Sequence, residues 1–222
     1  MRTHPIGTGP FKFVDFKPNE YIKVARNTDY WKPGLPHLDG IEYTIIKDVS
    51  TRLLAFLADK TDVYFGVTIP QLKDVKTQAP DAICETFTAN VARNMLVNWN
   101  VPPFDNPELR RAMSLTLDRK AFNDIINEGQ GEIGAVMQPP PDGLWGMPEE
   151  MLRTLPGYSP DVEKSRAEAR KIMEKLGYGP DKPLSVKLST RNIAPYRDPA
   201  VILIDQLKHI YVNAELDPID TT

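Results

Sequence analysis

The sequence of 222 residues contains a single cysteine, Cys84, so no disulfide can form within the chain. Its three histidines, His4, His37 and His209, lie far apart, and none has a partner at the spacing of a metal site, so no metal centre is expected. No apolar run reaches the ~18 residues of a membrane span. The first residues also lack the apolar core of a signal peptide. A mature exported protein would look the same, so the compartment stays open at this point.

An excess of charge of one sign is absent as well. Lysine and arginine number 27, aspartate and glutamate number 30, and the net charge is −3. This balance argues against nucleic acid or an anionic membrane surface as a partner. The hydrophobic share of 41% and the charged share of 26% are those of an ordinary globular protein.

Motifs of catalysis and cofactor binding are missing too. The turn Gly7-Thr8-Gly9-Pro10 lacks the following helix and lysine of a phosphate-binding loop, and no cofactor is expected. Glu149 and Glu150 are adjacent, so their side chains point apart, as in a solvated turn. Cys84 lies in an apolar run, which favours a buried structural thiol over a reactive one. The sequence therefore predicts a protein that is not an enzyme.

What is present is a change of character along the chain, with residues 94–122 at its centre. Asn94 to Asn98 is apolar enough for a buried strand, and Pro102 and Pro103 end any strand pairing there. Asp105 or Asn106 can then cap a helix that contains Pro107. This strand, rigid elbow and helix are typical of a crossing between two lobes.

Strands and helices are expected on both sides of this elbow. Before it, the patterns predict a hairpin turning at 17–20 and strands at 41–46, 63–65 and 83–87, with helices opening at Asp48 or Ser50 and at Ile69. After it, they predict a helix capped by Asp118, a helix capped by Ser159, a strand at 184–188, a helix starting at Asp198-Pro199 and a strand at 215–219. The last three elements read as a βαβ unit. The fold class is therefore α/β (mixed α+β).

Several side chains stand beside the rigid loops and are candidates for a ligand site. Arg191, Asn192 and Tyr196 follow a strand and precede a helix, which is where open α/β sheets place ligands. Trp99 and Trp145 could form walls of a cleft. For each of these residues a purely structural role is also possible. Trp99 could fill the core below the elbow, Trp145 could cover the end of the helical part, and Arg191 with Asn192 could belong to an ordinary polar loop. A further group of basic residues on one helix is interpreted as a solvated, salt-bridged face, namely Lys164, Arg166, Arg170, Lys171 and Lys175.

Four segments, taken in order, resemble one family. They are GTGPFKFVDFKPNEYIKVARNTDYW at 7–31, LDGIEYTIIKDVSTRLLAFLADKTDVYFG at 38–66, NMLVNWNVPPFDNPELRRAMSLTLDRKAF at 94–122, and the helix ending EKLGYG at 174–179. The chain is similar in these segments to the extracellular solute-binding proteins of peptide/nickel-type ABC importers. The resemblance covers nearly the whole chain.

This resemblance implies a periplasmic binding protein of type II with two lobes that close on a solute. It implies that the chain is incomplete, with residues 1–93 as the strand-rich part of a first lobe and residues 94–222 as the first part of a helix-rich second lobe. It also implies a peptide or similar small solute, ABC membrane subunits as partners and a periplasmic location. Tyr196 fits the family's ligand loop best.

Three functional hypotheses follow. The leading one is the solute-binding component of an ABC importer, with self-association of the truncated chain through unpaired strand edges. The alternative is a stand-alone interaction or scaffold domain on the same fold. The third, a peptide hydrolase, would need a nucleophile and a base that the sequence does not show.

Overall fold

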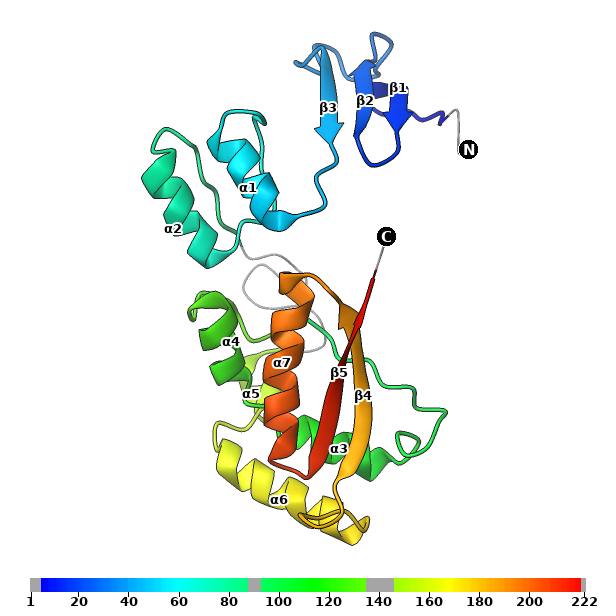
Figure 1. The fold of residues 1–222 in the computed structure, drawn as a ribbon, viewed down its shortest axis with the longest axis vertical. Helices are drawn as coiled ribbons and strands as arrows, with labels where there is room; N and C mark the ends of the chain where they lie inside the picture. Colours follow the sequence, from blue (N-terminus) through cyan, green and yellow to red (C-terminus); the bar gives the residue numbers. More distant parts are fainter. Residues whose placement is uncertain (1–4, 88–92, 135–145, 221–222) are drawn as a thin grey trace. The chain divides into compact units, whose positions relative to one another are not determined.

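The computed structural model describes residues 5–87, 93–134 and 146–220. The chain forms two compact units, Met1–Cys84 and Glu85–Thr222 (Figure 1). The family resemblance implies a lobe boundary after residue 93. In the structure Met95 and Val97 pack against the core of the second unit. The assignment of the two units to lobes stays a prediction.

The first unit holds strands and two helices: β1 (Phe11–Lys17), β2 (Tyr21–Arg26), β3 (Gly40–Thr44), α1 (Val49–Leu57) and α2 (Ile69–Gln78). The second unit holds α3 (Pro107–Leu115), α4 (Arg119–Asn127), α5 (Glu149–Leu152), α6 (Val162–Lys175), β4 (Leu184–Arg191), α7 (Ala194–Lys208) and β5 (Val212–Ile219). None of the described helices is long and apolar enough to cross a membrane.

In the first unit, β1, β2 and β3 form an antiparallel sheet in that order. The predicted hairpin is confirmed, because Lys17 pairs with Tyr21. The register shifts between Phe13 and Asp15, so that Phe13 pairs with Val24 and Phe16 with Ile22. This bulge places both phenylalanines on one apolar face despite their odd spacing.

Both predicted helix starts of the first unit are confirmed. The side chain of Asp48 accepts a hydrogen bond from the backbone N–H of Thr51 at 2.7 Å and caps α1. Thr68 and Gln71 form a reciprocal capping box at the start of α2.

Three predicted strands are wrong. Residues 63–65, 83–87 and 94–98 form no strand. Each segment has a strongly exposed apolar side chain, since Phe65, Ile83 and Leu96 are 81%, 92% and 90% exposed. Cys84, expected to be buried, is exposed for the same reason, because its segment pairs with no strand in the described part of the chain. Apolar alternation indicates that a segment suits a sheet, but a strand also needs a partner with free hydrogen-bonding groups.

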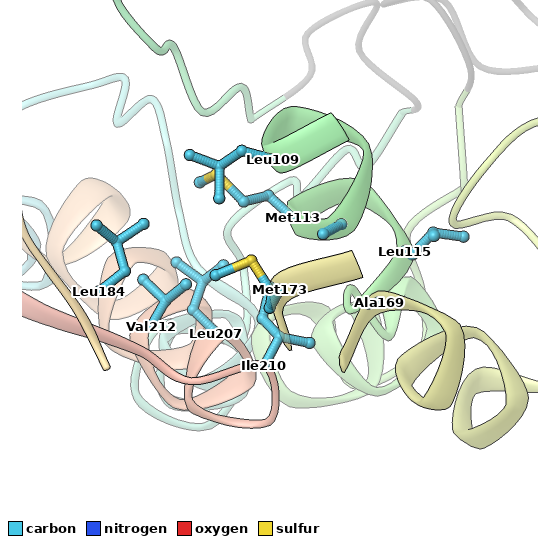
Figure 2. Packing of buried hydrophobic residues seen from close by; sticks show 10 residues of the cluster. Leu109, Met113, Leu115, Ala169, Met173, Leu184, Leu207, Ile210 and Val212 are labelled. Carbon is cyan, nitrogen blue, oxygen red and sulfur yellow. The ribbon is translucent and has the colours of Figure 1, made fainter. Parts of the chain in front are cut away.

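The core of the second unit is built on α3. Asn106 caps this helix through a hydrogen bond from the N–H of Glu108. Leu109, Ala112 and Met113 are buried, as the spacing predicts. They pack against Met173 of α6 and against apolar residues at the ends of α7, β4 and β5 (Figure 2). Asp118 caps α4, also as predicted.

Helix α6 begins later than predicted. Asp161, not Ser159, is its N-cap and accepts from the N–H of Lys164, whereas the Ser159 hydroxyl accepts from the N–H of Asp161. Arg166 does not belong to a solvated face. It is buried, and its Nε donates to the carbonyl oxygen of Thr116 at 3.1 Å, which ties α6 to the end of α3.

The predicted βαβ unit is confirmed, with β4 and β5 parallel and α7 between them in the chain (Figure 1). Helix α7 starts at Ala194 rather than at Asp198, because Pro195 can occupy the first turn, where a missing N–H costs no hydrogen bond. Pro199 consequently lies inside the helix. Val201 was expected to face inward, but it is 51% exposed because the neighbouring Ala200 occupies the buried face.

Candidate functional site

Parallel strands β4 and β5 have one apolar and one polar face. Leu184 and Val212 are buried in the core, whereas the alternate residues of β4 are exposed. In register, Lys187 pairs with Glu215 and Ser189 with Asp217. The Ser189 hydroxyl donates to the Asp217 carboxylate at 2.7 Å, which shows that in-register side chains share this face. The polar face leads to Arg191, the last residue of β4.

Arg191 is exposed at the carboxyl end of β4, and its guanidinium lies over the ring of Tyr196, 5.1 Å from the centroid. Among the described residues, no carboxylate lies within salt-bridge distance of Arg191. Its planar donors therefore remain available for an anion.

The loop after Arg191 is held by hydrogen bonds to its surroundings. The backbone N–H of Asn192 donates to the carbonyl oxygen of Ile219 at 3.2 Å, which joins the loop to the end of β5. The Thr190 hydroxyl donates to the carbonyl oxygen of Tyr196 at 3.4 Å. The carboxyl end of this sheet therefore carries three exposed side chains, those of Arg191, Asn192 and Tyr196.

Of the two candidate tryptophans, the structure describes Trp99 and does not describe Trp145. Trp99 lies in the turn before α3 and is 67% exposed, so it does not fill the core there. The ring and cation–π contacts of the described residues do not join it to Arg191 or Tyr196. Trp145 lies outside the described residues, as does His4.

Sequence reasoning missed Ser189 and Asp217, which belong to the same polar face. The alternation of polar residues along 185–191 and 213–217 was the available signal. What the sequence could not provide is the register, which alone brings Ser189 opposite Asp217.

The acidic, histidine and cysteine side chains and the perturbed ionisable groups of the described residues point to no second site. In the described part of the chain, no group of three or more His, Cys, Asp or Glu side chains could hold a metal ion. Burial lowers the pKa of Arg119, whose guanidinium lies 3.9 Å from the ring centroid of Tyr158. The hydrogen bond to Glu174 raises the pKa of Tyr211. Arg119 thus joins α4 to the segment before α6, and Tyr211 joins the turn after α7 to α6, so both groups are structural.

Comparison with known proteins decides the family. The sequence model described as bacterial extracellular solute-binding proteins, family 5 (middle), matches residues 1–222. The chain belongs to this family. The type II periplasmic binding protein fold expected from the sequence is therefore confirmed for the part of the fold that this chain covers.

Individual relatives agree with this assignment. The chain is 30% identical to the heme-binding protein A of Haemophilus influenzae over 80% of its length, and 26% identical to the oligopeptide-binding protein AppA of Bacillus subtilis over 96% of its length. It superposes with a TM-score of 0.76, at 22% identity, on the dipeptide-binding protein of Pseudoalteromonas sp. SM9913 solved with Met-Leu, covering 98% of this chain and 41% of that one.

The 222-residue chain spans only part of the length of these relatives. It covers 30% of the length of the heme-binding protein and 39% of that of AppA.

Proposed function

We propose that the chain is part of the solute-capturing component of an ABC importer that takes up peptides or similar small solutes. The match of the family model along all 222 residues carries this proposal. The related proteins are described as binding heme, oligopeptides, or di- and tripeptides. These solutes differ in size but share carboxylate groups.

Within this function, we assign solute contact to the carboxyl edge of β4 and β5. The exposed guanidinium of Arg191 has no acidic partner among the described residues and can bind a solute carboxylate through two parallel N–H groups. Asn192 would line the same edge, and Tyr196 lies there with its ring against Arg191. Open α/β sheets place ligands at the carboxyl ends of their strands, which supports this assignment. Trp99, as an exposed aromatic surface, and Trp145 remain predicted wall residues.

Calorimetry can test the assignment in the protein as the cell produces it, with whatever chain flanks residues 1–222. The probes are a dipeptide and the same dipeptide with an amidated carboxyl terminus. We expect Arg191→Ala to weaken binding of the free dipeptide about 10-fold or more and to leave the amide unaffected. Arg197→Ala is the matched control, because Arg197 lies in the same segment but already pairs with Asp198 at 3.3 Å.

The family description also supports a location outside the cytoplasm. We infer that the protein acts in the periplasm and delivers its solute to ABC membrane subunits, without bond chemistry of its own. Fractionation of the producing cells checks the location, and recovery of the protein only in the cytoplasmic fraction would contradict it.

We further propose that the 222-residue chain self-associates by strand pairing. In the structure β4 and β5 pair only with each other, so each leaves one row of backbone groups without a strand among the described residues. The apolar side chains of Val63, Phe65, Ile83 and Phe87 are exposed as well. Light scattering that shows a monomer across the micromolar range would count against this proposal.

A further inference from the structure

We propose that Tyr196 is a positioning residue for Arg191 rather than a direct contact of the solute. This inference rests on the proposed function, since it concerns how the carboxylate-binding group at the sheet edge is held. The ring of Tyr196 is the only group in the described part of the chain that holds the Arg191 guanidinium in place.

The backbone fixes Tyr196 before any solute arrives. Its carbonyl oxygen accepts from the Thr190 hydroxyl at 3.4 Å, and its N–H donates to the carbonyl oxygen of Ile193 at 3.0 Å in the first turn of α7. Tyr196 therefore belongs to the first turn of α7, whereas Arg191 is the last residue of β4. A long arginine side chain on an exposed edge would otherwise sample many rotamers, and ordering it on binding would reduce affinity.

The stacked geometry leaves the N–H groups at the edge of the Arg191 guanidinium accessible to a carboxylate. A cation over an aromatic face uses the plane of the guanidinium, whereas a carboxylate binds its edge through two parallel N–H groups. Stacking on Tyr196 and binding a carboxylate can thus occur together. The phenolic hydroxyl has no part in this arrangement and makes no hydrogen bond to the described residues.

A direct contact and a positioning role make different predictions for substitutions. Tyr196→Phe retains the aromatic face, and Tyr196→Leu keeps much of the apolar volume but removes the face. If Tyr196 positions Arg191, Phe keeps full affinity and Leu weakens binding of a carboxylate by about 2–5-fold, the range of an exposed cation–π pair.

A double-mutant cycle tests the positioning role of Tyr196. Binding of a dipeptide and of its carboxyl-terminal amide is measured in the protein as the cell produces it. We expect Tyr196→Leu to weaken the free dipeptide in the wild type but to have no effect in the Arg191→Ala background, and no effect on the amide. An equal loss in both backgrounds, or for both probes, would overturn the positioning role and leave the proposed function intact. A wild type that binds the dipeptide and its amide equally would overturn both.

A second measurement needs no solute. A guanidinium above an aromatic ring has its side-chain protons shifted upfield in the NMR spectrum. We expect this shift for Arg191 in the 222-residue chain and in Tyr196→Phe, and its loss in Tyr196→Leu. An Arg191 spectrum that is the same in all three proteins would overturn the proposal.

Discussion

Gln206 shows how a single residue holds three elements of the second unit together, through its side chain and its backbone carbonyl. Its side-chain NH₂ donates to the carbonyl oxygen of Asp118, and its side-chain oxygen accepts from the N–H of Asp118, both at 3.0 Å. The buried Thr116 hydroxyl donates to the carbonyl oxygen of Gln206. Replacing the amide leaves both backbone groups of Asp118 without this partner.

Gln206→Leu should therefore lower the free energy of unfolding by about 2–4 kcal/mol, since each unsatisfied buried group costs about 1–3 kcal/mol. Asp205→Ala is the control, because Asp205 is an exposed neighbour on the same helix and pairs with Lys208 at 3.5 Å. Its loss should change stability by less than about 0.5 kcal/mol. Urea unfolding measures both, and equal effects of the two substitutions would contradict the prediction.

Gly157 provides a second test at the residue scale. It has a φ of +82°, and a Cβ there would lie 2.0 Å from the carbonyl oxygen of Ser114. Gly177 has a similar φ of +85° but nothing within 4 Å of its Cβ position. Gly177→Ala should thus cost only the backbone strain of about 1–2 kcal/mol. Gly157→Ala should cost about 2–5 kcal/mol in urea unfolding, because a clash with backbone is added.

At the scale of elements, helix starts were predicted more reliably than strands, although α6 and α7 begin at other residues than expected. A cap is local: Asp48, Asn106 and Asp118 each bond a backbone N–H two or three residues away, so sequence spacing is enough to find it. A strand depends on a partner that can be far away. The segments around Phe65 and Leu96 have strand-like alternation but no partner strand in the described residues.

The start of α1 yields a pH-dependent prediction. Hydrogen bonds from the hydroxyl and the backbone N–H of Thr51 lower the pKa of Asp48 below its ordinary value of 3.8. The charged cap thus stabilises the helix fully above the unfolded pKa, and this stabilisation is lost as the pH falls through the lower folded pKa. The protection of the α1 amides against hydrogen exchange, relative to their intrinsic exchange rates, should therefore fall below pH 3.8 in the wild type. In Asp48→Asn, which caps without charge, the loss of protection should be smaller; an identical pH profile would argue against the role of the cap.

At the scale of the whole molecule, the family could be recognised from ordered sequence motifs, but the arrangement of the candidate site could not. Arg191, Asn192 and Tyr196 were found because a polar loop follows a strand. The stacking of Arg191 on Tyr196 depends on α7 starting at Ala194, four residues earlier than the sequence predicted, since a helix starting at Asp198 would leave Tyr196 outside it. The pairing of Ser189 with Asp217 depends on the strand register.

The exposure of this site leads to a prediction about binding by the 222-residue chain alone. A typical ligand pocket buries about 70–90% of its ligand, whereas Arg191, Asn192 and Tyr196 all stand exposed at one sheet edge. A dipeptide held there by one carboxylate contact would keep most of its surface in water. We therefore expect a dissociation constant in the millimolar range or weaker, since one charge-assisted contact must offset the loss of translational freedom. Calorimetry with the dipeptide checks this, with Arg191→Ala as the control for specific binding. A micromolar dissociation constant for the chain alone would show that residues 1–222 by themselves enclose the solute.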